Sequence, residues 1–157
     1  MENSNQILKN IKKLSARNLG YMAAIIDGEG CVRIQNERIL RISVGNTSTK
    51  LFKFLNNKIG GKTFRLKNGV GEVKGSFGMN KKPFYSWRVA GDSAHFLLLK
   101  ISDDLIIKRE AAKWALKFKE TFNHGIRYRR GGLPKSVWDR RKLISNKVNS
   151  HNRGRNL

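Results

Sequence analysis

The sequence predicts an α+β fold, an αββαββα core in which helices cover one face of an antiparallel sheet. Apolar residues recur with a helical period and then with a strand period, twice in series along the chain. The length of 157 residues suits one domain of ordinary size. Apolar residues make up 39% of the chain, close to normal globular usage, so a hydrophobic core can form.

The first predicted helix runs over residues 19–27, with Ser15 or Asn18 as its cap. It is apolar all round, so we expect it to be buried or packed on two sides. Gly28 and Gly30 are expected to end it. Residues 31–46 then alternate between apolar and polar side chains on either side of a short turn at 36–38, which is the pattern of a hairpin with one apolar face.

A second helix is predicted after the hairpin, with caps among residues 46–49 and an end at Gly60-Gly61. The strand pattern returns with Phe64 and Leu66 expected to point inward, and again at 85–89. Between these strands, residues 68–83 are rich in glycine and lysine, and form either a long loop or an extra ribbon.

Further helices are predicted at 94–101, where Asp92 or Ser93 is the cap, and at about 107–122. A basic loop follows, and then a last amphipathic helix near 134–149. We therefore divide the chain into a core, residues 1–125, and a basic C-terminal extension, residues 126–157, which is either part of the same domain or an appendage that contacts nucleic acid.

The charge of the chain is abnormal and unevenly distributed. There are 33 Lys and Arg residues against 11 Asp and Glu, a net charge of +22. Residues 31–91 carry 13 basic and two acidic residues, and residues 126–157 carry ten basic and one acidic. Such a surplus repels itself, so we expect an anionic partner, nucleic acid before an anionic membrane. A solvated charged face is the plainer alternative.

Several classes of protein are excluded by composition. The longest fully apolar run, residues 21–26, is far short of a membrane span, and the N-terminus resembles neither a secretory signal nor a transit peptide. A single cysteine, Cys31, rules out a disulfide framework and a cysteine-based zinc cluster. We expect an intracellular protein that binds no membrane. The sequence does not distinguish an organelle, an archaeon, a bacterium or a phage as its source.

The face of the sheet that helices do not cover is predicted to read DNA. It is nearly free of acid and rich in side chains that hydrogen-bond base edges in the major groove. Its predicted members are Arg33, Gln35, Arg41, Ser43, Thr63, Arg65, Lys67, Ser86 and Arg88. Lys74 in the insertion and Arg127, Arg129 and Arg130 in the tail are expected to bind DNA as well, the tail through phosphates.

Two acids stand at the end of the first predicted helix, in the run Asp27-Gly28-Glu29. A carboxylate there faces the negative end of the helix dipole, at a cost of about 0.3–1 kcal/mol when exposed. A divalent cation would explain the pair, because Mg²⁺ takes carboxylate and carbonyl oxygens, and Gly28 would bare its own carbonyl. The alternative is a turn in which both acids bind local amides.

These residues carry a family resemblance. The run Met22-Ala23-Ala24-Ile25-Ile26-Asp27-Gly28-Glu29-Gly30 resembles the signature of the LAGLIDADG homing endonucleases. Apolar, small and acidic residues fall in the order of that motif. The predicted order of elements also resembles the core of that family over roughly residues 15–122, with the sheet curved as a saddle over DNA.

The resemblance implies a role for each residue of the motif. In that family the motif helices pack in pairs, so the dimer interface would include Tyr21, Met22, Ala23, Ala24, Ile25 and Asp27. Glu29 would be a catalytic metal ligand, helped by the Gly28 carbonyl, with Mg²⁺ or Mn²⁺ bound; Asp27 would be structural. Glu replaces the commoner Asp at this ligand position. Only one copy of the motif is visible, so the chain should form a homodimer on a pseudo-palindromic duplex.

Three further catalytic candidates follow from the resemblance. Asn46, at the end of the second predicted strand, would hold water, and Lys50, one turn on, could assist. Lys108 matches a lysine near the cleaved phosphate. The ordinary alternatives are a helix cap for Asn46 and a surface charge for Lys108.

The resemblance therefore implies a site-specific, metal-dependent endonuclease that cuts both strands of a long target, of the intron or intein homing type. One alternative keeps the fold without the chemistry, as a maturase that binds intron RNA or as a DNA-binding regulator. Another is a basic ribosomal or RNA-binding structural protein, which leaves the acids unexplained. A histidine nuclease is disfavoured, because His95, His124 and His151 lie far apart in the sequence.

Overall fold

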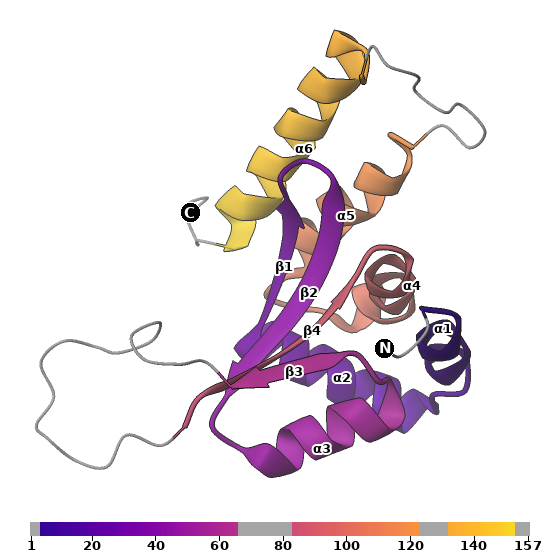
Figure 1. The fold of residues 1–157 in the computed structure, drawn as a ribbon, viewed down its shortest axis with the longest axis vertical. Helices are drawn as coiled ribbons and strands as arrows, with labels where there is room; N and C mark the ends of the chain where they lie inside the picture. Colours follow the sequence, from indigo (N-terminus) through magenta and orange to yellow (C-terminus); the bar gives the residue numbers. More distant parts are fainter. Residues whose placement is uncertain (1–3, 66–82, 123–131, 153–157) are drawn as a thin grey trace, which may run out of the picture.

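The computed structural model describes residues 4–65, 83–122 and 132–152. Two helices precede a pair of strands, one helix separates this pair from a second pair, and the remaining helices follow (Figure 1). In chain order they are α1 (Ser4–Lys12), α2 (Ala16–Glu29), β1 (Gly30–Gln35), β2 (Ile39–Asn46), α3 (Thr49–Lys58), β3 (Lys62–Arg65), β4 (Tyr85–Ala90), α4 (Asp92–Ile101), η1 (Ser102–Asp104), α5 (Arg109–Lys119) and α6 (Lys135–Asn152).

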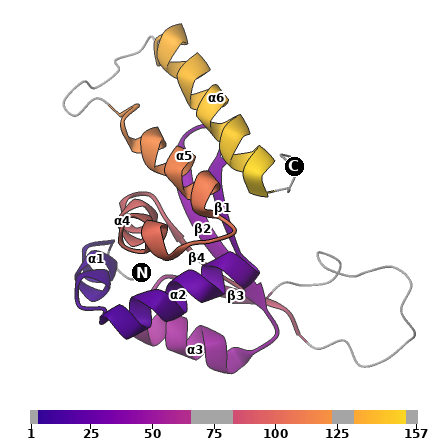
Figure 2. The ribbon, with the colours of Figure 1, turned by 180° about the vertical axis from the view of Figure 1, so that it is seen from behind.

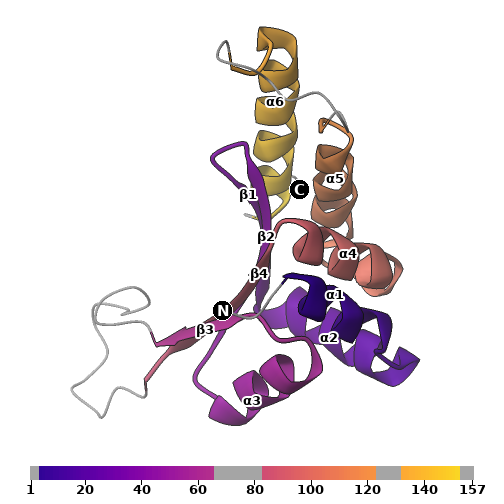
Figure 3. The same ribbon diagram turned by 45° about the vertical axis from the view of Figure 1, so that its right-hand side comes forward.

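The four strands form one antiparallel sheet in the order β1-β2-β4-β3, which confirms the predicted α+β class. β1 and β2 are joined by a tight turn in which Asn36 and Glu37 both have φ of 50° and the Arg38 amide donates to the Gln35 carbonyl. Figure 3 shows the helices gathered on one side of the sheet and the opposite face without a covering element.

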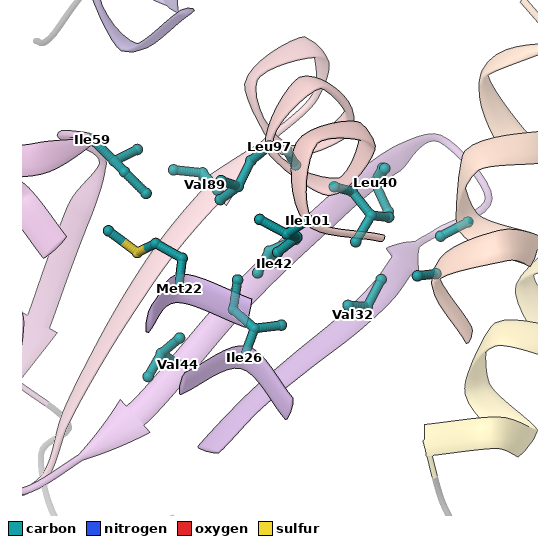
Figure 4. Packing of buried hydrophobic residues seen from close by; sticks show 14 of the residues in the cluster. Met22, Ile26, Val32, Leu40, Ile42, Val44, Ile59, Val89, Leu97 and Ile101 are labelled. Carbon is teal, nitrogen blue, oxygen red and sulfur yellow. The ribbon is translucent and has the colours of Figure 1, made fainter. Parts of the chain in front are cut away.

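The core lies between the covered face of the sheet and helices α2, α4 and α5. Val32, Ile42 and Val44 point from the strands toward Met22 and Ile26 of α2, as Figure 4 shows. All five side chains are at most 1% exposed. Alternating residues on β1, β2 and β4 thus bury one face, as the period-two pattern predicted.

Strand β3 departs from the prediction. Phe64 was expected to point inward and Arg65 outward, but the register pairs Thr63 with Trp87 and Arg65 with Tyr85, on the covered face. Phe64 pairs with Ser86 on the open face. Directly opposite residues of an antiparallel pair share a face, so the inward and outward assignments of this strand were wrong.

Other boundaries also differ from the sequence prediction. Helix α1, which the sequence analysis did not predict, packs on α4 through buried Ile7 and Ile11. The N-cap of α4 is Gly91, with φ of 63°, rather than Asp92 or Ser93, so Asp92 opens the first turn.

Helix α6 packs along α5 and β1, and its Ile144 and Val148 belong to the same hydrophobic core (Figures 1 and 2). Arg141 anchors it: only 4% exposed, its guanidinium donates to the Thr121 hydroxyl at 2.9 Å and to the Thr121 carbonyl at 3.2 Å. Burial of an arginine is tolerated when its donors are satisfied in this way.

Candidate nucleic-acid interface and active site

The open face of the sheet carries three arginines close together. Arg33 and Arg41 are direct cross-strand partners on β1 and β2, and Arg88 on β4 lies beside Ser43, diagonal to Arg41. Like charges placed directly opposite destabilise a sheet. This arrangement is therefore unfavourable in the isolated chain and becomes favourable when a polyanion lies on it.

The electrostatics of this cluster support that interpretation. Partial burial lowers the pKa of the Arg41 guanidinium, and the positive charges of Arg88 and Arg33 lower it further. Among the described residues, the ion pairs of the molecule lie on helices, at Lys113–Glu110, Lys119–Asp92 and Arg140–Glu120, so none neutralises the open face. Gln35 and Ser86 also lie on this face, as the sequence predicted.

The two acids at the end of α2 occupy different environments. Asp27 is 8% exposed, and its carboxylate accepts hydrogen bonds from the amides of Ile106, Ile107 and Lys108 at 2.5, 3.1 and 2.9 Å. It therefore caps the segment that leads into α5, and its oxygens already have three donors. This satisfies a buried charge that a helix C-terminus would otherwise disfavour.

The same contact brings Lys108 to the end of α2. The Lys108 ammonium donates to the Asp27 carbonyl oxygen, across a separation of 81 residues in the sequence. A cation at a helix C-terminus is favourable, because the carbonyls of the last turn carry partial negative charge. The segment is braced further by Arg109, whose side chain donates to the carbonyls of Leu105 and Asp103 at 2.8 and 2.9 Å.

Glu29, in contrast, is exposed at the last position of α2. Gly28 beside it is also exposed, and a Cβ added there would meet no atom within 4 Å. The donor set is thus one carboxylate and one carbonyl, both hard oxygens of the kind Mg²⁺ prefers. The chemistry of these two oxygens fits a divalent cation, although a single chain supplies only one side-chain carboxylate here. Within the described part of the chain, no three His, Cys, Asp or Glu side chains gather to hold a metal.

Asn46 ends β2 next to the junction of α2 and β1, since Gly30 pairs with Val44 two residues earlier in β2. Its Oδ1 accepts a hydrogen bond from the Ser48 amide at 2.9 Å, and Ser48 is itself the N-cap of α3. Asn46 thus shapes the turn into α3, and Lys50 is exposed in the first turn of that helix.

One stripe of α2 is free for a partner. Gly20, Tyr21, Ala24 and Gly28 are exposed at the spacing of one helical face, and both glycines border open space. Figure 2 shows no element in front of this helix. Tyr21 is 51% exposed and its ring lies edge-on to Phe54 of α3, with centroids 5.0 Å apart.

The residues predicted for a dimer interface differ in how much surface they present. Met22, Ala23, Ile25 and Asp27 are only 0–9% exposed, because they pack inside the chain's own core or cap the segment before α5. Tyr21 and Ala24 are exposed.

The register changes which predicted residues lie on the open face. Arg65 shares the covered face of the sheet with Thr63, whose hydroxyl bonds Asn56 of α3 at 3.0 Å, so neither belongs to the open face. Lys62 and Phe64, which the sequence analysis did not place there, lie on the open face instead. Lys67, Lys74, Arg127, Arg129 and Arg130 lie outside the described residues, as does His124.

His95, on α4, lies apart from the residues at the end of α2, beside the ion pair of Lys119 and Asp92. Burial lowers its pKa, the charge of Lys119 lowers it further, and Asp92 opposes the shift.

In the described ranges, none of the helices has the length and apolar character needed to cross a bilayer.

Comparison with known proteins gives a fold but no sequence relative. No protein-family profile matches the chain, and no curated protein matches it. Among solved structures, the chain is similar to the homing endonuclease I-CvuI in complex with the I-CreI target in the presence of Mg, in which the DNA was not cleaved. The TM-score is 0.61 and the sequence identity 18%, and the match covers 85% of this chain and 80% of that one. A second structure, I-CvuI with its own target Sro1.3 and Ca, has a TM-score of 0.60, 19% identity and coverage of 95% and 85%.

The order of elements, the open four-stranded sheet and this similarity agree with one another. The chain has the α+β fold of the homing endonuclease I-CvuI.

Proposed function

We propose that this protein is a LAGLIDADG homing endonuclease, which binds duplex DNA as a homodimer and cuts a specific site by metal-dependent phosphodiester hydrolysis. The observation that carries the proposal is the difference in environment between the two acids at the end of α2. The Asp27 carboxylate accepts hydrogen bonds from three backbone amides, whereas Glu29, two residues later, is exposed where α2 leads into β1 of the arginine-bearing sheet. The Lys108 ammonium donates to the Asp27 carbonyl at the same end of α2.

The open face supports duplex binding. Arg33, Arg41 and Arg88 supply donors for guanine edges and phosphates, and Gln35 can pair with adenine. A twisted two-stranded ribbon is an element that enters the major groove. The DNA in both similar structures is a target duplex of I-CvuI or I-CreI, and we extend that substrate class to this chain.

The geometry of α2 supports a homodimer. A stripe of small residues, Gly20, Ala24 and Gly28, lets two helices approach closely, and Tyr21 at its border offers apolar area. Because Glu29 lies at the end of this stripe, a two-fold axis through it would place two copies of that carboxylate side by side.

A divalent cation held by Glu29 and the Gly28 carbonyl would supply charge neutralisation and an activated water for hydrolysis. Lys108 would offset negative charge that develops on the phosphate, and Asn46 would orient water from the end of β2. Lys50, in the first turn of α3, would neutralise a neighbouring phosphate.

The test begins with the wild-type chain, Mg²⁺ and a library of duplex DNA, with sequencing of any ends produced. We expect cuts at one pseudo-palindromic sequence, and their loss in Glu29→Gln with DNA binding retained. Asp139→Asn is the matched control, since it also removes one exposed acidic charge, on α6, which packs on α5 and β1. Sedimentation of Ala24→Arg, expected to be monomeric, tests the dimer.

Other outcomes separate the rival functions. Tight, sequence-specific binding without cuts in the wild type would favour a DNA-binding regulator, and preference for structured RNA over duplex DNA would favour a maturase or a structural RNA-binding protein. Cuts that persist undiminished in Glu29→Gln would refute the role of that carboxylate.

A further inference from the structure

Phe64 occupies an unusual place for a large apolar side chain. It lies on the open face of the sheet, in register with Ser86, and 39% of it is exposed although the covered face is available to the neighbouring positions of β3. The sequence pattern placed it in the core. Its exposure on a surface otherwise rich in arginine requires another explanation than core packing.

The ring of Phe64 carries the guanidinium of Arg88, whose central carbon lies 4.4 Å from the ring centroid. The Arg88 Nε is shielded from solvent, and within residues 4–65, 83–122 and 132–152 it has no hydrogen-bond acceptor. No carboxylate in those ranges is paired with Arg88. Within the described part of the chain, the Phe64 ring therefore supports this guanidinium.

Such a support has a thermodynamic consequence. A flexible arginine side chain loses rotamer entropy when it binds, and it loses less when the guanidinium is already held in place. Bidentate pairing with guanine O6 and N7 requires one orientation of the guanidinium plane, whereas contact with a phosphate tolerates many. A pre-oriented guanidinium thus favours reading a base over contacting the backbone.

We propose that Phe64 is a positioning residue for Arg88, which it holds in the orientation that reads guanine in the major groove. This inference rests on the proposed function, because it requires that the open face binds duplex DNA. Phe64 acts through Arg88 and contributes no charge of its own.

The test measures base preference at each position of the site. The full-length chain and its variants select from a randomised duplex library without added divalent cation, and competition binding quantifies the result. Arg88→Ala should reduce the preference for guanine at one position of each half-site by about 5- to 150-fold, the value of a good bidentate pair. Phe64→Leu should reduce preference at that same position by about two- to fivefold, the value of an exposed cation–π contact.

Two further variants make the result specific. Phe64→Trp keeps an aromatic face and should restore the wild-type preference at that position. Ile39→Ala removes another exposed apolar side chain of the same face, 44% exposed on β2, and should leave that position unchanged. The dependence of affinity on salt should be the same for Phe64→Leu as for the wild type, because no charge is lost.

Three results would overturn the inference. In the first, Arg88→Ala relaxes the position while Phe64→Leu does not. In the second, Phe64→Leu alters a different position, such as a thymine whose methyl group it would touch directly. In the third, Arg88→Ala weakens all sequences equally, as loss of a phosphate contact does. A wild-type chain that enriches no sequence would instead refute the proposed function, and this inference with it.

Discussion

Replacement of Asp27 tests whether the hydrogen bonds of this carboxylate stabilise the folded chain. In Asp27→Ala, the amides of Ile106, Ile107 and Lys108 lose an ionised acceptor. A hydrogen bond to a charged group contributes about 1.5–3 kcal/mol. The sum over three bonds is an upper bound, because the side chains of Ile106 and Ile107 are 82% and 73% exposed and water can reach part of this segment.

We therefore expect Asp27→Ala to lower the free energy of unfolding by about 3 kcal/mol. For a chain of this length, that corresponds to a fall in Tm of about 6–12 °C. Asp27→Asn should cost less, about 2 kcal/mol, since one amide oxygen still accepts while its NH₂ group faces a donor. Urea denaturation followed by tryptophan fluorescence, to which the buried Trp87 contributes, measures both, and hydrogen exchange reports the amides of residues 106–108.

Glu29→Ala is the matched control, two residues away on the same helix. Because Glu29 is exposed at the negative end of the helix dipole, its removal should leave stability unchanged or raise it slightly. The critical result is that Asp27→Ala lowers the free energy of unfolding and Glu29→Ala does not. Equal effects of the two substitutions, or unchanged exchange of the three amides in Asp27→Ala, would refute the role assigned to Asp27.

The remaining predictions concern packing and pH. Gly30→Ala should destabilise by about 2 kcal/mol in urea denaturation, because a Cβ would lie 2.5 Å from a main-chain oxygen of α2, whereas Gly28→Ala, with open space, should not. Arg141→Met should release α6, seen as faster hydrogen exchange there, while Thr121→Val, which removes one acceptor, should have a smaller effect. Folding lowers the pKa of His95, so the unfolded chain binds more protons than the folded one near neutral pH. The free energy of unfolding should therefore fall as the pH drops through about 6.5. His95→Gln should make the free energy of unfolding depend less on pH, and an unchanged pH dependence in this variant would contradict the prediction.

The sequence was most informative where one face of an element is buried and the other is not. In β1, β2 and β4 large apolar residues alternate with polar ones around Arg33, Arg41 and Arg88, so the pattern alone assigned these arginines to the open face, and the register confirms it. β3 has no such constraint: it is an edge strand, all four of its residues are exposed, and burial therefore gives no signal for its register. Phe64 was misplaced for this reason.

Helix α2 shows a second limit. Its sequence is apolar or small on every side, so the rotation of the helix about its axis cannot be derived from periodicity. Ala23 and Ala24 are equivalent in the sequence, yet one is buried at 2% exposure and the other faces solvent. Packing against the sheet and α4 made that choice, and with it the surface left for a second copy.

The sequence by itself determined the class of fold, the segregation of charge and the position of the two acids at a helix end, because these follow from local periodicity and composition. Only the tertiary structure decided which acid is free. The amides that occupy Asp27 come from residues 79 to 81 positions later in the chain. No local pattern encodes a contact of that range, since it exists only after the core has brought the segment before α5 against the end of α2.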